Sequence, residues 1–387
     1  RYESTDRLGW SDTSCSAFVL GDERVIGKTN TVFLNPACQG GAPAMTQKGT
    51  LAEWRDTVAA KCRGNPILIA SVSLAFAAPL LEFLERDSIG LHLRGASSSG
   101  KTTALGAAVS VWGSPKLMHS WRATANALEA VATTCNSTLL ALDEFALVSG
   151  REVGDVIYTL SNGQGKARSS SRGKLQQINT WRLAILSTGE ITLAEKMGEA
   201  GKKPMTGQQI RFIDVAADSR RYGAFDELHG AKDSGEFAGS VKQATSGVHG
   251  SAGAEFVRAL CGAKNLADRL NESIRRQQSI LLQSYGGRLD RAFDRAMGHF
   301  ALIAIAGELA TIRGITGWSS GEASRAVGIL AAEWLDAQCR SDQRQTEEAL
   351  ERTRAYLLAN GPALFETKTS SVLNRAGYRD DEFFYIL

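Results

Sequence analysis

The sequence predicts an α/β fold, in which a parallel β-sheet is sandwiched by helices and followed by an all-α lid and a partial winged-helix-like end. The first observation is an apolar run at residues 89–94 that leads directly into a glycine-rich loop and then into helical periodicity at residues 102–112. The second is a series of short apolar runs that alternate with helical segments, at residues 116–119, 138–142, 182–187 and 210–216. Such alternation is typical of a parallel sheet covered by helices. The third is a wholly helical pattern from about residue 250 to 339, which predicts the lid.

The chain of 387 residues is longer than one average domain, so we expect two or more structural units. Short β-like runs at residues 15–20 and 31–34 predict a small β-rich region at the start, and helices are expected at 51–62 and 66–85. The predicted units are residues 1–48 (β-rich region), 49–248 (α/β core), 249–345 (helical lid) and 346–387 (winged-helix-like module). Because the chain begins at Arg1 and stops inside an apolar run, we expect it to be a fragment of a longer protein.

Composition excludes several classes of protein. The 44 basic residues are nearly matched by 41 acidic ones, so any nucleic-acid surface must be local. The six cysteines form no CxxC pair, which favours reduced thiols in a cytoplasmic protein over a zinc site. The longest apolar stretch, residues 66–84, contains Pro79 and Glu82, which favours a buried helix pair over a membrane span, and no signal-peptide pattern precedes it.

The glycine-rich loop has the pattern GxxxxGK[ST], followed by Thr103, and consists of Gly95, Ala96, Ser97, Ser98, Ser99, Gly100, Lys101 and Thr102. A loop of this kind between a strand and a helix points backbone N–H groups at an anion, and its glycines permit close approach. Lys101 is expected to reach the β- and γ-phosphates of ATP, and the Thr102 hydroxyl to ligate Mg²⁺. The alternative interpretation is a serine- and glycine-rich surface turn.

A second strand, residues 138–142, ends in two carboxylates, Asp143 and Glu144. Walker B segments have this form: Asp143 would hold Mg²⁺ and Glu144 would activate the attacking water. The pair favours an ATP hydrolase over a small-molecule kinase. The alternative is an ordinary strand end.

Two further strands offer polar residues to the same chemistry. The run at 181–186 is followed by Ser187 and Thr188, either of which could position the lytic water, and Thr188 is the predicted catalytic residue. Arg211 lies inside an otherwise apolar run and could reach the γ-phosphate of a neighbouring subunit as an arginine finger, which would make the active unit an oligomer. The alternatives are a strand-terminal turn and a structural ion pair of Arg211 with Asp214 or Asp218.

Cations mark two more regions. Residues 162–174 contain no acidic side chain and predict a hairpin whose basic tip contacts the phosphate backbone of single-stranded or forked DNA, through Lys166, Arg168, Arg172 and Lys174. A solvated loop is the alternative. Arg291 and Arg295 lie one helical turn apart in the lid, and Arg295 is the candidate nucleotide sensor, although surface ion pairing would explain both. The five histidines form no cluster, and Trp112, Trp121 and Trp181 are expected in the core.

With these residues assembled, the chain resembles the domain-of-unknown-function 927 family of phages and integrative mobile elements, which is related to the minichromosome maintenance (MCM) helicases of the AAA+ class. The similar segments are Gly90 to Gly113, Trp121 to Asn126, Leu142 to Glu144, Asn162 to Arg168, Leu186 to Glu190, Arg211 to Asp218, Ala306 to Ala310 and Thr316 to Trp318. The resemblance implies a P-loop (AAA+) core in a homo-oligomeric, hexameric ring that hydrolyses ATP between subunits and moves on single-stranded DNA. It departs from the MCM motif at Ile210, where serine is expected before the arginine.

We therefore expect an ATP-dependent DNA helicase of a mobile element or phage, without a membrane partner. Two alternatives stay open. An AAA+ protein remodeller would present an aromatic and hydrophobic loop tip, whereas this one is cationic. An ATP-regulated DNA-binding replication-initiation factor would bind DNA without unwinding it, and the intact Asp143–Glu144 pair argues against a site that only drives assembly.

Overall fold

The computed structural model describes residues 3–5, 7–27, 32–34, 44–166, 178–283, 291–368, 370–373, 375–380 and 383–386. The chain forms two compact units, Arg1–Ala332 and Glu333–Leu387. The finer domain boundaries expected from the sequence stay predictions.

A five-stranded parallel sheet is the centre of the first unit, and its strands lie in the order β10-β6-β9-β8-β7. Their bounds are Ile89–Arg94 (β6), Met118–Ser120 (β7), Leu139–Asp143 (β8), Ala184–Gly189 (β9) and Phe212–Ala216 (β10). The predicted fold class is confirmed. Because parallel strands end at the same edge, the carboxyl ends of β6, β8 and β9 lie together, with β9 between the other two.

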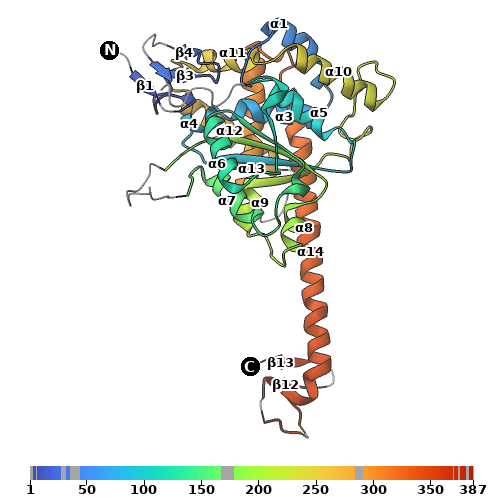
Figure 1. The fold of residues 1–387 in the computed structure, drawn as a ribbon. Coiled ribbons are helices and arrows are strands. Elements are labelled where there is room, and N and C mark those ends of the chain that lie inside the picture. The colour runs from blue at the N-terminus through green and yellow to red at the C-terminus, as the bar shows by residue number, and fades with distance from the viewer. Residues whose placement is uncertain are drawn as a thin grey trace. The chain divides into compact units, whose positions relative to one another are not determined.

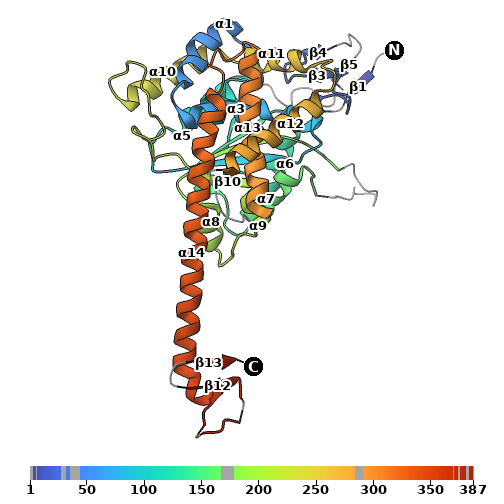
Figure 2. The same cartoon turned by 180° about the vertical axis from the view of Figure 1, so that it is seen from behind.

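Helices cover both faces of this sheet (Figures 1 and 2). One face carries α6 (Ala125–Thr134), α7 (Val153–Asn162) and α8 (Leu193–Gly198), whose apolar residues form a core cluster with β8 and β9. The other face carries α3 (Pro66–Ala77) and α5 (Lys101–Val109), and α13 (Arg291–Ile312) packs on α3. All twelve residues of α3 are buried, because this helix lies between the sheet and α13.

One predicted strand begins later than its apolar pattern indicates. Residues 210 and 211 belong to helix α9 (Thr206–Arg211), and the strand starts at Phe212. The physical reason is the side chain of Gln208, whose Oε1 accepts from the N–H of Met205 at 2.8 Å and whose Nε2 donates to the carbonyl of Gly154 at 2.9 Å. Gln208 therefore caps and anchors a helical turn that the apolar pattern did not indicate. The strand expected at 182–187 likewise begins at Ala184.

The N-terminal region is β-rich, as expected. Strands β2 (Gly9–Trp10), β3 (Ala17–Val19) and β4 (Val25–Gly27) form an antiparallel sheet, and β1 (Glu3–Thr5) pairs with β5 (Val32–Leu34). Trp10 fixes this region to the core, since its indole N–H donates to the carbonyl of Pro79 at 2.9 Å and its ring packs edge-on against Phe18 and Phe83. The three tryptophans predicted to lie in the core, Trp112, Trp121 and Trp181, are at most 2% exposed.

Short elements connect these parts. The predicted helix at 51–62 is continuous and is made of α1 (Leu51–Trp54), a π-helical turn η2 (Arg55–Ala59) and α2 (Ala60–Cys62). The helix expected at 66–85 is interrupted at Pro79, after which α4 (Leu80–Phe83) begins. Two 3₁₀ turns, η3 (Pro115–Leu117) and η4 (Phe145–Leu147), precede β7 and follow β8.

The region after β10 is helical, with α10 (Ser234–Gly247), α11 (Ser251–Leu260), α12 (Leu266–Gln283), α13 and α14 (Glu322–Leu364). Within the described residues one segment, Ala292–Ile312 of α13, has the length and apolar composition of a membrane span. Of its most apolar 18-residue stretch, 56% is buried, as in the core helix of a folded protein, because α13 packs on α3 and α12.

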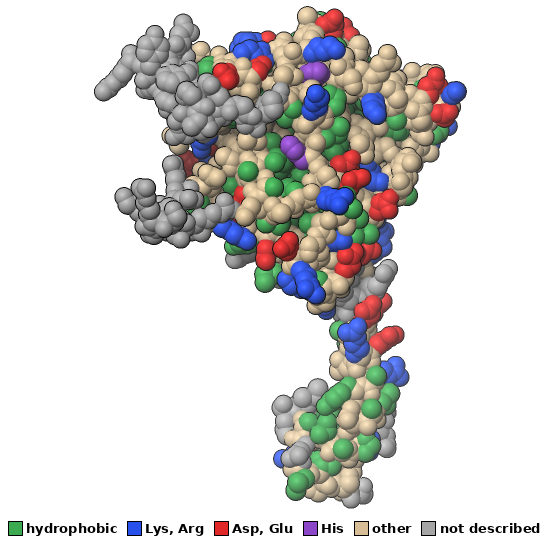
Figure 3. Space-filling view, viewed as in Figure 1, with side chains coloured by type: hydrophobic (Ala, Val, Ile, Leu, Met, Phe, Trp, Pro, Cys, Tyr) green, Lys and Arg blue, Asp and Glu red, His purple; other side chains and the backbone are tan. Residues whose placement is uncertain are grey.

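The second unit contains the C-terminal part of α14 and a small sheet in the order β11-β12-β13, with strands Phe365–Glu366, Gly377–Arg379 and Phe384–Ile386. A helix followed by a β12–β13 hairpin matches the predicted helix-plus-hairpin pattern. Its surface carries exposed apolar side chains, which gather in Figure 3: Leu350, Tyr356, Leu358, Tyr378 and Phe383. On the face of the first unit shown there, basic and acidic side chains are interspersed, in keeping with the small net charge of +3.

Candidate nucleotide site

The predicted phosphate loop connects the end of β6 to the first turn of α5. Gly100 is the N-cap of that helix and has a φ of +101°, a conformation that glycine adopts without strain. A Cβ at this position would lie 2.5 Å from Cζ of Phe225. Glycine is therefore required at position 100 for two reasons: the positive φ, and the lack of space for a side chain beside Phe225. Ser98 also has a positive φ, of 61°.

The segment that follows β10 braces this loop. The Asp218 carboxylate accepts a 2.7 Å hydrogen bond from the backbone N–H of Ala96, and the carbonyl of Ser99 accepts from the N–H of Ala224 at 2.7 Å. Phe225 is completely buried and closes on Gly100 from the same segment. Sequence reasoning missed these braces, because more than 100 residues separate them from the loop and Asp218 was weighed only as a partner of Arg211.

Lys101 lies folded over the loop and is only 8% exposed. Its Nζ donates to the carbonyl oxygens of Gly95 and Ala96, at 2.8 and 2.5 Å. Burial lowers the pKa of Lys101, and the nearby carboxylates of Glu190, Asp218 and Asp143 oppose this effect. The ammonium group thus stands at the loop that is expected to cradle phosphate.

The Asp143 carboxylate, at the end of β8, is contacted by residues that follow or end the neighbouring strands β6 and β9. Its Oδ2 accepts from the hydroxyl of Thr102 at 3.2 Å, and its Oδ1 accepts from the backbone N–H of Glu144 at 2.9 Å. The hydroxyl of Thr188 also donates to Oδ1. Thr103, the next residue of α5, is half-buried, and no contact of its side chain with Asp143 is seen among the described residues.

The donor set fits Mg²⁺. This ion takes oxygen ligands at about 2.1 Å in octahedral geometry, so adjacent ligand oxygens stand about 3 Å apart. Thr102 Oγ1 and Asp143 Oδ2, at 3.2 Å, have close to this separation. The two residues that the sequence predicts as metal ligands therefore offer one edge of an octahedron.

Glu144 has a left-handed backbone, with φ 63° and ψ 56°, and its side chain is exposed. Non-glycine residues adopt this conformation at a cost of about 1–3 kcal/mol, and such residues gather at functional sites. The kink turns the chain into η4 and leaves the carboxylate beside Asp143, open to solvent.

Ser187 and Thr188 point to opposite faces of the sheet, because side chains alternate along a strand. Thr188 contacts Asp143 on the face that α5 covers. Ser187 Oγ lies instead among His92 and Trp121, 2.9 Å from His92 Nδ1 and 2.9 Å from the indole nitrogen of Trp121. Of the two hydroxyls left open by the sequence, only that of Thr188 lies beside Asp143, at the edge of the sheet where the nucleotide is predicted (the nucleotide edge).

Arg211 lies at the opposite edge of the sheet, where the strands begin. It immediately precedes β10, whereas the phosphate loop follows the carboxyl end of the parallel strand β6. Its guanidinium is 3.5 Å from Asp87, whose side chain is 65% exposed. Asp214 pairs instead with Arg94 at 3.0 Å, and Asp218 binds the loop, so neither ion pair weighed from the sequence forms.

Arg295 lies near Arg211 and not at this chain's own phosphate loop. One turn further along α13, His299 Nδ1 is 3.2 Å from the carbonyl of Ile210. Burial, together with the smaller effects of the charges of Arg86, Arg211 and Arg295, lowers the pKa of His299 to about 4. The predicted sensor and the predicted finger therefore both lie in the surroundings of His299.

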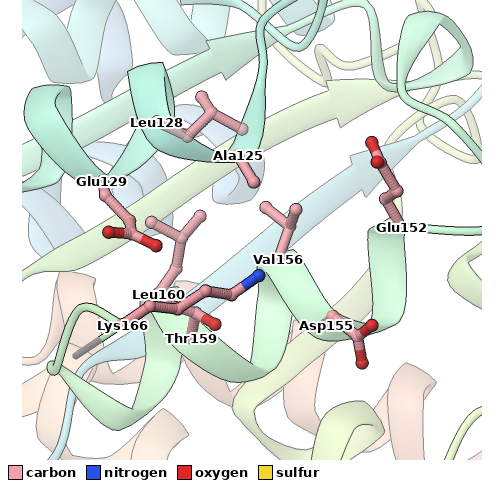
Figure 4. A pocket seen from close by; sticks show the side chains of 9 residues that line it. All are labelled: Ala125, Leu128, Glu129, Glu152, Asp155, Val156, Thr159, Leu160 and Lys166. Carbon is pink, nitrogen blue, oxygen red and sulfur yellow. The ribbon is translucent and has the colours of Figure 1, made fainter. Parts of the chain in front are cut away.

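Of the four predicted DNA-binding cations, Lys166 is described, whereas Arg168, Arg172 and Lys174 lie outside the described residues. Lys166 lines a cavity of about 130 Å³ between α6 and α7, and its side chain extends over Leu160 and Thr159 (Figure 4). Glu129, Glu152 and Asp155 line the same cavity. The predicted basic hairpin contains no acidic residue, but its first cation, Lys166, shares this cavity with carboxylates from the neighbouring helices.

The chain is similar to known proteins in part of its sequence and in its fold. Residues 1–180, which include the phosphate loop and the Asp143–Glu144 strand, match the family described as "Domain of unknown function (DUF927)". The fold is similar to that of a solved structure described as "SCCmec type IV Cch - active helicase", with a TM-score of 0.65 and 18% sequence identity. The similarity covers 98% of this chain and 69% of that chain. No curated protein matches the sequence.

Proposed function

We propose that this chain is the ATPase motor of a DNA helicase or translocase from a mobile genetic element or phage, which hydrolyses ATP at subunit interfaces and moves on single-stranded DNA. The observation that carries the proposal is the meeting of Thr102, Asp143 and Thr188 beside Lys101 at one edge of the sheet. The DUF927 segment and the fold similarity to an active helicase support the choice of a DNA motor.

The residues of the site divide the work by position. ATP with Mg²⁺ would supply the phosphoanhydride to be cleaved and the charge that stabilises the leaving phosphate. Lys101 leaves the carbonyls of Gly95 and Ala96 to hold the phosphates, while Thr102 and Asp143 hold the metal. The exposed carboxylate of Glu144 takes the proton of the attacking water, and Thr188 fixes the orientation of Asp143.

Arg211 acts on a different subunit in this proposal. It lies at the edge of the sheet opposite the phosphate loop, so it does not serve its own site, and the exposed Asp87 is a partner that it can leave. Arg295, close by, would face the same neighbouring nucleotide. A closed homo-oligomer, for which we propose a hexameric ring, places every such edge against a neighbour's phosphate loop.

The test uses Lys101→Ala and Glu144→Gln, with Glu152→Gln as the matched control. Glu152 is also an exposed glutamate of the first unit, but it lines the cavity between α6 and α7. We expect both site variants to lose ATP turnover by at least about 100-fold, because Lys101→Ala removes the cation proposed to hold the phosphates and Glu144→Gln removes the base proposed to take the proton of the water. Glu144→Gln should still bind ATP, and Glu152→Gln should behave as the parent. Retained turnover in both site variants would refute the ATPase.

A strand-displacement assay then separates the helicase from its rivals. Duplexes with 3′ or 5′ single-stranded tails should be unwound by the parent chain with ATP and not by Glu144→Gln. ATP hydrolysis that DNA does not stimulate, with no displacement from either tail, would favour a protein remodeller. DNA binding without displacement would favour a replication-initiation factor.

A further inference from the structure

A buried cluster of five side chains lies directly behind the nucleotide edge, on the face of the sheet away from Thr188. Its members are at most 2% exposed and are His92, Trp121, Phe145, Ser187 and Phe212. His92, Ser187 and Phe212 belong to β6, β9 and β10, Trp121 follows β7, and Phe145 lies in η4, just after β8.

The rings of the cluster are densely packed. The His92 ring stacks on Phe212 at a centroid distance of 5.2 Å and lies 4.6 Å from Phe145, while Trp121 meets Phe145 edge-on at 5.1 Å. Phe145 and Phe212 are themselves 5.7 Å apart. A Cβ on Gly189 would lie 2.6 Å from Cβ of Phe145. Packing this dense transmits a displacement of one ring to the next.

A directed hydrogen-bond chain runs through the same cluster. The carbonyl of Ile191, 3.0 Å from His92 Nε2, can only accept, so Nε2 carries the proton. Burial lowers the pKa of His92 to about 4, so the ring is neutral at pH 7 and Nδ1 accepts from the Ser187 hydroxyl at 2.9 Å. Ser187 Oγ then accepts from the indole N–H of Trp121 at 2.9 Å. Every donor in this chain has an acceptor, which fixes the orientation of all three side chains.

Three residues of the cluster are each the immediate sequence neighbour of a predicted catalytic residue. Phe145 follows Glu144, Ser187 precedes Thr188 and Phe212 follows Arg211. The backbone N–H of Trp121 donates to the carbonyl of Asp143 at 3.0 Å. No ring of the cluster reaches the nucleotide edge itself, so its influence is confined to the placement of these neighbours.

We propose that this cluster is a positioning unit that couples the chain's own hydrolysis site to the arginine it offers to the next subunit. The inference rests on the proposed function and deepens it. Glu144 sits at a kink with φ 63°, and movement of that kink shifts Phe145 against His92 and Phe212. Because Phe212 begins the strand that follows Arg211, the state of one site is passed to the arginine at the opposite edge of the sheet.

The first test is Trp121→Phe, which keeps a ring and removes the N–H that Ser187 accepts. Trp54→Phe is the matched control: Trp54 is also completely buried and also donates to a serine Oγ at 2.9 Å, that of Ser110 at the other end of α5. We expect Trp121→Phe to lower kcat for ATP at least fivefold with KM within twofold of the parent, and Trp54→Phe to change neither. Equal effects of the two variants at equal melting temperature would show a structural role only and overturn the proposal.

The second test measures coupling between subunits and does not depend on Trp121→Phe folding. Subunits with Glu144→Gln supply an intact arginine but cannot hydrolyse, and subunits with Arg211→Ala hydrolyse only with a neighbour's arginine. Mixing them should restore turnover. Adding Phe212→Leu to the Glu144→Gln subunits alone should then reduce the restored turnover at least threefold, although the hydrolysing subunits are unchanged.

The outcomes separate the two proposals. Restored turnover that Phe212→Leu leaves unchanged would overturn the coupling and leave the proposed ATPase intact. If the mixture of Glu144→Gln and Arg211→Ala subunits restored no turnover while the unsubstituted chain hydrolyses ATP, the arginine finger of the proposed function would be overturned. The coupling would be overturned with it.

Discussion

Gly100→Ala tests the geometry of the phosphate loop most directly. The φ of +101° places the alanine outside the allowed regions for a residue with a Cβ, at a cost of about 1–2 kcal/mol. The new Cβ would also lie 2.5, 2.8 and 3.1 Å from three ring carbons of Phe225. That ring is completely buried and packs edge-on against Phe237 at 4.9 Å, so it has no room to withdraw. Overpacking of this kind costs about 1–3 kcal/mol.

The two costs together come to about 2–5 kcal/mol, which corresponds to a loss of ATP affinity of about 30- to several thousand-fold if the loop shifts to relieve them. The assay is titration of MgATP by calorimetry, with the melting temperature as a second reading. Phe225→Leu, added to Gly100→Ala, should recover the packing part and leave the dihedral part, and a double-mutant cycle isolates the difference.

Gly106→Ala is the matched control in the same helix. It lies in the interior of α5, and, apart from its chain neighbours and the backbone of its own helix, no described atom comes within 4 Å of the position of its Cβ. We expect it to stabilise the protein by about 0.5–1 kcal/mol, because alanine loses less backbone entropy than glycine in a helix. Unchanged ATP affinity in Gly100→Ala would refute the reasoning about this loop.

Two further predictions concern Thr188 and His92. Thr188→Val keeps the shape of the side chain but removes the hydroxyl that donates to Asp143, so kcat should fall about 10- to 100-fold while Thr188→Ser retains activity; equal rates in steady-state assays would exclude the role. The folded-state pKa of His92 is about 4, below its unfolded value of about 6.5, so the unfolded chain takes up the proton first and stability is lost as the pH falls through this window. Between pH 7 and pH 5 the contribution of His92 to the free energy of unfolding should fall by about 2 kcal/mol, as measured by urea unfolding. The variant His92→Gln should lack this part of the pH dependence. The same slope in that variant would show that the imidazole is not held neutral. Asp214, whose pKa burial raises to about 6, gains stability over the same range and offsets part of the loss from His92 and His299.

The glycine-rich loop and the Asp143–Glu144 strand could be placed next to one another from the sequence because each is a contiguous segment. A glycine-rich loop between a strand and a helix creates its anion site wherever the helix begins, and an apolar strand places the residue after it at the edge of a parallel sheet. The alternation of strands and helices predicted the sheet for the same reason. The end of α9 was missed because Gln208 stabilises that turn through Gly154, which is distant in the sequence.

Which of two neighbouring hydroxyls faces the nucleotide was not readable from the sequence. Alternation places Ser187 and Thr188 on opposite faces, but only the pairing of β9 with β8 decides which face meets Asp143. Similarly, the ion pairs of Arg211 and Asp214 follow from strand register and from the position of Asp87 before β6. Local charge spacing indicated neither.

By itself, then, the sequence determined the parallel α/β core, the residues of the phosphate loop and the paired carboxylates, since each is a property of a continuous segment. Tertiary structure alone decided that Asp218 and Phe225 brace that loop, that Thr188 and not Ser187 turns to Asp143, and that Arg295 lies beside Arg211. The physical reason is that these contacts join segments far apart in the chain, and only strand order, register and dense packing bring such segments together.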